Sequence, residues 1–163
     1  MNRLILVLLI AFPLTALSQK YSKSSIVGEW KIVKVEVYED NFPPLKTAYL
    51  KEIAGRTDTI IEGLDLGDKD DQANQVVKSI ISSTLNFGDT DFFSWDVRTV
   101  GLSFYDKFWK MENDTILVNE WADKESRNGG LIGFKVLSLE NDKLLLDAND
   151  SGGGLKFELI RVK

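Results

Sequence analysis

The sequence predicts an all-β protein, either a sandwich or a barrel. Short alternating apolar runs fill most of the chain, polar turn residues separate these runs, and a single stretch has helical spacing instead. The chain has 163 residues, of which 44% are hydrophobic. This length is typical of one domain that can bury a sizeable core. We therefore expect one β domain.

The first 18 residues have the composition of a secretory signal peptide. Arg3 supplies a positive charge, an apolar run extends from Leu4 to Leu14, and Ala16–Ser18 supplies small residues before a cleavage site. A retained membrane anchor would need about 20 continuous apolar residues, and this run is shorter and contains a proline. We expect residues 1–18 to be removed and residues 19–163 to form the exported domain, without a membrane span, in the periplasm or outside the cell. A lipid anchor is not expected, because the chain has no cysteine.

Eight strands are expected from the alternation of apolar and polar residues between turn signals. They are Ile26–Tyr38, Ser83–Phe87, Phe92–Arg98, Phe104–Met111, Thr115–Trp121, Ile132–Leu139, Lys143–Ala148 and Leu155–Val162. Four polar segments favour tight turns between them: "GDTD", "ENDT", "ENDK" and the glycine-rich "NDSGGG".

Alternation also predicts which side chains face the core. Five residues in the second and third strands share one parity and should lie on one face, namely Leu85, Phe87, Phe93, Trp95 and Val97. In the first strand the apolar residues change parity, from Trp30 and Ile32 to Val33 and Val35. Such a change indicates a β-bulge or a strand that is apolar on both faces.

One segment departs from the β pattern. Apolar residues at helical spacing predict an amphipathic helix over Asp71–Ser82, with Asp70 or Asp71 at its N-cap. Before this helix lies a long polar connection, Glu39–Lys69, of the kind that is usually a functional lid or disordered. Residues Ala48–Ala54 are a candidate for a short helix within it.

The composition excludes several kinds of site. The chain has neither histidine nor cysteine, so Ser-His-Asp and Cys-His catalysis and the usual zinc sites are excluded. The acidic pairs, such as Asp89 and Asp91, lie beside predicted turns, where solvated carboxylates are ordinary. The net charge of −5 disfavours nucleic acid as a partner. We expect no enzyme activity, no metal and no cofactor.

The aromatic residues form the strongest constellation for binding. Five of them on predicted strands are candidates to line a ligand pocket: Phe87, Phe93, Trp95, Phe134 and Phe157. The interior of an eight-stranded barrel is just wide enough either to fill with side chains or to hold one small ligand. Large inward rings fit both outcomes, so the sequence leaves the two open.

The stretch "VGEW", at the start of the first strand, resembles the Gly-x-Trp signature of the lipocalins. Most of the mature chain resembles the small secreted lipocalin-like domains of Bacteroidetes-type bacteria, through "IVGEWKIVKVEV", a helix leading into "STLNFGDTDFFSW", then "FWKMENDTILV", "FKVLSLENDKLLLDA" and "LKFELIRVK". The resemblance implies an eight-stranded antiparallel up-and-down β-barrel, to which the helical spacing adds one amphipathic helix between the first two strands. It also implies that Trp30 closes the barrel base and that Arg161 packs on its ring.

Two departures from the lipocalin pattern limit what the resemblance implies. The chain lacks a Thr-Asp-Tyr-like turn, and its first connection is long and contains a helix rather than being short. The resemblance therefore supports the fold more than the class of ligand.

Two functions remain open from the sequence. The first is a non-catalytic, monomeric, secreted lipocalin-like protein that binds a small hydrophobic molecule in its barrel. The alternative is a protein-interaction module or inhibitor that acts through residues 39–69 or the outer barrel face. The alternative predicts a filled barrel and an exposed apolar patch, with Phe92, Tyr105 and Trp109 as the outward residues.

Overall fold

The computed structural model describes residues 20–63, 68–97, 102–119, 131–150 and 152–163. The signal peptide predicted at residues 1–18 lies outside this part of the chain. The described elements are α1 (Lys23–Ile26), β1 (Gly28–Glu39), β2 (Lys46–Ile53), β3 (Arg56–Gly63), α2 (Asp68–Ile80), β4 (Thr84–Phe87), β5 (Phe92–Val97), β6 (Leu102–Glu112), β7 (Thr115–Asn119), β8 (Leu131–Glu140), β9 (Lys143–Asp150) and β10 (Gly153–Arg161).

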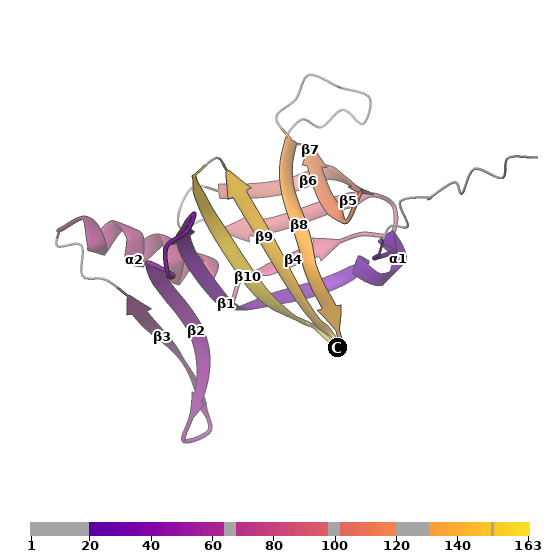
Figure 1. Ribbon diagram of the computed structural model, residues 1–163. Helices are drawn as coiled ribbons and strands as arrows, with labels where there is room; N and C mark the ends of the chain where they lie inside the picture. The colour runs from indigo at the N-terminus through magenta and orange to yellow at the C-terminus, as the bar shows by residue number, and fades with distance from the viewer. Residues whose placement is uncertain (1–19, 64–67, 98–101, 120–130, 151) are drawn as a thin grey trace, which may run out of the picture.

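Eight of these strands form a closed antiparallel β-barrel, which confirms the predicted fold class (Figure 1). From β4 to β10 each strand pairs with the next along the chain. β1 closes the ring, because it pairs with β10 along one edge and with β4 along the first part of the other. Each of the eight predicted strands corresponds to one barrel strand, with shifts of a few residues at the ends.

Two of the predicted turns, "ENDT" and "ENDK", and the predicted core face are also confirmed. Asn113, Asp114, Asn141 and Asp142 all have positive φ angles, between 48° and 63°, as two-residue type I′ hairpin turns require. The five residues from Leu85 to Val97 that share a parity are all buried in the core. Local turn chemistry and period-two burial therefore fix most of the barrel.

Three register shifts interrupt the pairing of the barrel strands, one of them in β8–β9 between Val136 and Ser138. The β1–β10 pairing shifts between Ile32 and Lys34, at the parity change seen in the sequence. The β5–β6 pairing shifts between Phe93 and Trp95, and such a shift moves neighbouring side chains to the other face. Trp109 is consequently buried, so its predicted outward position is wrong. Phe92 does face outward, with 46% of its surface exposed.

The segment predicted as a long loop is largely β structure, so both the loop and the short helix at Ala48–Ala54 are wrong. β2 and β3 pair along their whole length as an antiparallel ribbon, Lys46–Gly63. β2 also pairs with the second part of β1, at Lys34–Val37. Figure 1 shows the ribbon projecting from the barrel wall. Ala54 and Gly55 form its turn, with φ angles of +51° and +77°.

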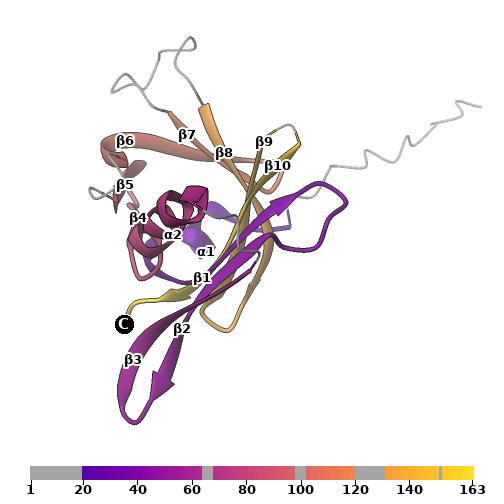
Figure 2. The same ribbon diagram turned by 90° about the vertical axis from the view of Figure 1, so that its left-hand side faces the viewer.

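α2 lies across one end of the barrel, as Figure 2 shows, and α1 lies at the other. The side chains of Val77, Ile80 and Ile81 are buried there. The helix spans Asp68–Ile80, whereas the spacing predicts Asp71–Ser82. Its end comes early because Ser82 has a φ of +68°, which a continuing helix cannot accommodate. Its earlier start places Asp70 and Asp71 within the first turn rather than at the cap.

Candidate functional site

The barrel end next to α1 is closed by Trp30 and Arg161, the two residues that the resemblance pairs. Trp30 is fully buried, and its indole nitrogen donates to the carbonyl of Ile26 at 2.7 Å. The guanidinium carbon of Arg161 lies 4.1 Å from the centroid of the Trp30 ring. Nη1 and Nη2 of Arg161 donate to the carbonyls of Val27 and Ser25, each at 2.7 Å. The arginine therefore joins the last strand to the start of the first.

Gly28 provides the space for this contact. Its φ of +133° lies in a region that residues with a side chain rarely adopt. A Cβ atom at this position would lie 2.6 Å from Nη1 of Arg161. The Gly-x-Trp step thus combines a glycine that admits the guanidinium with the indole on which it packs.

The five residues predicted to line a pocket pack against one another inside the barrel. They are 0–6% exposed. The Phe87 and Phe93 ring centroids lie 5.1 Å apart, and Trp95 and Phe157 meet edge to face at 5.9 Å. Phe134 joins both groups, at 6.4 Å from Phe93 and 6.3 Å from Phe157. These rings therefore form a connected core, and whether they also take a ligand stays a prediction.

Three hollows have linings that include none of these five rings. One, of about 550 Å³, is lined by Lys20, Tyr21, Ser22, Ser25 and Leu139. A second, of about 270 Å³, lies between the ribbon and α2 and is lined by Lys46, Thr59, Ile61, Gly63, Asn74 and Lys78. A third, of about 180 Å³, is lined by Lys34, Glu36, Leu145, Lys156 and Glu158.

The ribbon presents one strand edge to its surroundings. β2 lies between β1 and β3, while β3 pairs with β2 and, within the described chain, with no further strand. In a two-residue hairpin, the residues that flank the turn, here Ile53 and Arg56, form a hydrogen-bonded pair. Because backbone groups alternate in direction along a strand, the N–H and C=O groups of Thr57, Thr59 and Ile61 point outward. We call these groups the free edge.

Side chains at the base of the ribbon connect it to α2. Lys46 is only 5% exposed, and its Nζ donates to Oδ1 of Asn74 at 2.7 Å. On the other face the Tyr49 hydroxyl donates to Oε1 of Glu62 at 2.9 Å. This hydrogen bond to a carboxylate raises the pKa of Tyr49. The ribbon is therefore fixed at its base and extended at its tip.

Two of the acidic residues near predicted turns take part in ion pairs. Asp91 pairs with Lys23, and Glu112 lies 2.6 Å from the amine of Lys110. In the described ranges no group of three or more acidic side chains could hold a metal ion. Helices long and apolar enough to cross a membrane are likewise missing from these ranges. The absence of catalysis, metal and cofactor stays a prediction.

Sequence reasoning missed the free edge. Its residues come from the polar segment that was expected to be a lid or disordered. Two signals point to it in retrospect: the Ala54-Gly55 turn, and the β-branched residues Thr57, Thr59 and Ile60 just after it.

Comparisons with protein-family models, with curated proteins and with solved structures found no match to this chain.

Proposed function

We propose that this protein is a non-catalytic protein-interaction module whose contact element is the β2–β3 ribbon. The observation that carries the proposal is the free edge of β3. Such an edge can accept an extended protein segment as an additional strand, with main-chain hydrogen bonds supplying affinity. The aromatic core is consistent with this proposal, because the rings predicted to line a pocket contact one another inside the barrel.

The ribbon is suited to this role by its exposure. Five of the eight residues of β3 are exposed and none is fully buried. β3 has no proline, and its pairing with β2 has no register shift. Proline, bulges and covering loops are the usual protection of an edge strand. In β3 the charged side chains are the main protection against unspecific strand pairing.

A photo-cross-linking amino acid placed at Thr59 tests this proposal in the producing organism. We expect Thr59 to cross-link to protein, because its backbone groups lie on the free edge. The matched position is Lys143, whose side chain is 67% exposed on the barrel, and there we expect no specific product. Combining the label at Thr57 with Thr59→Pro should abolish capture, because proline removes an outward N–H. Equal capture at Thr59 and Lys143 would contradict the proposal.

A second candidate function is binding of a small apolar molecule at the barrel end beneath α2. One observation favours it: a helix, rather than strands, closes this end, through Val77, Ile80 and Ile81. Displacement of α2 would give a ligand access to the interior. Binding of a small hydrophobic molecule in the barrel is the first of the two functions expected from the sequence, which does not by itself assign the ligand to this end.

Native mass spectrometry of gently purified protein tests the second candidate. A bound molecule would add mass that organic extraction removes. Ile80→Trp should prevent the addition by filling the space, whereas Val76→Trp should not, because Val76 is exposed on α2. A mass equal to the polypeptide alone would contradict this function.

We also infer that the chain is an exported, lipocalin-like protein. The closed eight-stranded barrel and the packing of Arg161 on Trp30 support the lipocalin-like assignment. The leader at residues 1–18 supports export, which N-terminal sequencing of secreted material would test. An intact Met1 on the secreted protein would contradict removal of the leader.

A further inference from the structure

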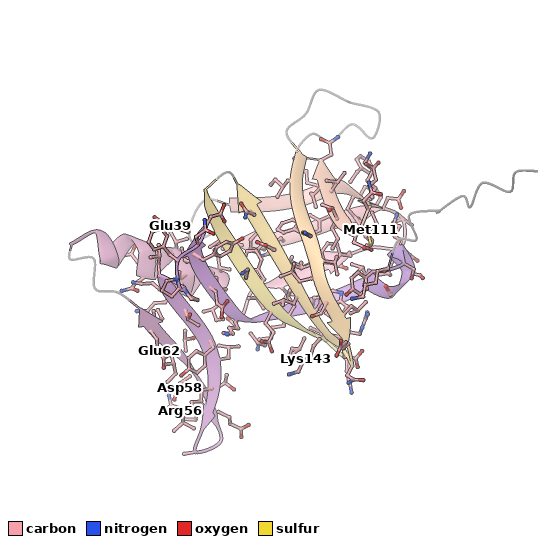
Figure 3. The ribbon with its side chains drawn as sticks, viewed as in Figure 1. Glu39, Arg56, Asp58, Glu62, Met111 and Lys143 are labelled. Atoms are coloured by element: carbon pink, nitrogen blue, oxygen red, sulfur yellow. The ribbon has the colours of Figure 1, made fainter. Side chains whose placement is uncertain are left out.

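We propose that the free edge of β3 pairs with the free edge of a second copy, in antiparallel orientation about a two-fold axis at Thr59. This inference rests on the proposed function and names the partner. It replaces the expectation of a monomer with a reversible dimer. Its basis is the pattern of charges along β3, in which Arg56, Asp58 and Glu62 follow one another on one face (Figure 3).

Backbone geometry limits the possible registers. Only residues whose N–H and C=O groups point outward can form hydrogen-bonded pairs with a neighbouring strand. On β3 these are the residues of the free edge, together with Gly63. Two copies can therefore pair only in registers that place these residues opposite one another, and such registers differ by steps of two residues.

Charge and the length of the contact together select one of these registers. With Thr59 opposite Thr59 of the second copy, Arg56 lies opposite Glu62 twice, and Asp58 lies opposite Ile60. A step of two residues in one direction places Asp58 opposite Glu62. A step in the other direction places Asp58 opposite its own copy. Like charges directly opposite each other destabilise strand pairing, and opposite charges stabilise it. Placing Thr57 opposite its own copy would also pair Arg56 with Asp58, but that contact would reach into the Ala54–Gly55 turn and could not continue as a strand.

Parallel pairing is disfavoured by the same charges. In-register parallel strands would bring Arg56, Asp58 and Glu62 each beside its own copy. The antiparallel arrangement about Thr59 instead forms three hydrogen-bonded pairs, Thr57 with Ile61 twice and Thr59 with itself. Each pair exchanges two bonds, so the contact gains about six backbone hydrogen bonds. The interface is isologous and closes as a dimer.

Engineered cysteines test the position of the axis, and the chain is well suited to this because it has none of its own. In the proposed dimer, the Cα atoms of residue 59 in the two copies lie about 5.5 Å apart, within the range for a disulfide. We expect Thr59→Cys to give a disulfide-linked dimer under mild oxidation. Thr57→Cys is the matched control, because the two copies of residue 57 would lie about 13 Å apart along the strands.

Charge reversal tests the register independently. Sedimentation equilibrium from about 1 µM to about 1 mM should show a reversible dimer of the wild-type chain. Arg56→Glu or Glu62→Arg alone should weaken the dimer at least about tenfold, because each creates two like-charge pairs. The double variant should recover the wild-type dissociation constant within about threefold. Circular dichroism checks that each variant keeps the barrel.

Three results would overturn the inference: a wild-type chain that stays monomeric throughout this range, equal cross-linking through Thr57→Cys and Thr59→Cys, or a double variant as weak as the single ones. A monomeric chain whose Thr59 still cross-links to another protein in cells would overturn the self-pairing alone. If Thr59 captures nothing in cells either, the proposed function fails as well.

Discussion

In the barrel each strand has a neighbour on both sides, whereas in the ribbon β3 has one partner within the described chain. The two regions also differ in the burial of their side chains. Barrel residues such as Leu146 and Phe157 are almost completely buried, while no residue of β3 is. Isolated two-stranded hairpins are marginally stable in water, so the ribbon depends on β1 and α2 at its base. The barrel therefore provides stability, and the ribbon provides exposed backbone.

Truncating the indole that closes the barrel should have the largest effect. We expect Trp30→Ala to lower the free energy of unfolding by about 3–5 kcal/mol, the usual cost of removing a buried aromatic side chain. Urea unfolding followed by circular dichroism measures this. Ile53→Ala at the ribbon tip is the matched control, because Ile53 is 44% exposed, and it should change stability by less than about 0.5 kcal/mol. Similar losses in both variants would contradict the division between barrel and ribbon.

Changing the arginine that packs on this indole should have the next largest effect. Arg161→Lys should cost about 1–2 kcal/mol, because one ammonium cannot reproduce the planar fork that binds the carbonyls of Val27 and Ser25. Arg56→Lys makes the same chemical change at an exposed position of the ribbon and should leave unfolding unchanged. The urea midpoints of the two variants test the difference. An Arg161→Lys midpoint equal to that of the wild type would show that the two hydrogen bonds of the guanidinium group do not contribute to stability.

The barrel could be predicted from the sequence because its strands are buried on one face. Phe93, Trp95 and Val97 alternate with polar residues, and this alternation reports the burial directly. In the ribbon both faces are largely polar, with Lys51 and Glu52 adjacent in β2, so alternation carries little information there. The ribbon was missed for this physical reason.

The candidate site was predictable in part. Trp30 and Arg161 could be named because a short local motif resembles a known pattern. The packing of Phe134 against Phe157 could not be predicted, because it depends on how strands far apart in sequence face one another. Trp109 was misplaced because the register shift between β5 and β6 leaves no clear local signal.

Two tyrosine hydroxyls allow a comparison at alkaline pH. Tyr38 of β1 donates to Asp147 of β9, and burial together with this hydrogen bond raises the pKa of Tyr38 to about 12. Since the unfolded value is near 10, the unfolded chain loses this proton first. Stability should therefore fall as the pH rises from about 10 to about 12, by no more than about 1 kcal/mol because the phenol is partly exposed.

Tyr38→Phe should reduce this alkaline loss of stability. Tyr49→Phe, which removes a ribbon hydroxyl bonded to Glu62, should leave the pH dependence of barrel unfolding unchanged. Urea midpoints measured at intervals from about pH 9 to about pH 12 give the comparison, because this range includes the ordinary tyrosine pKa and approaches the raised pKa of Tyr38. Equal slopes for Tyr38→Phe and the wild type would rule out the proposed effect of Tyr38.

The smallest expected effect is confined to the ribbon turn. Ala54 has a φ of +51°, a conformation that asparagine tolerates better than alanine and that type I′ turns favour. Ala54→Asn should stabilise the ribbon locally by about 0.5 kcal/mol without changing the urea midpoint of the barrel.

Amide hydrogen exchange can measure the stability of the ribbon separately from that of the barrel, because opening of the ribbon need not unfold the barrel. We expect slower exchange in β2 and β3 and unchanged exchange in β8 and β9. A uniform change in both regions would mean that ribbon and barrel open as one unit.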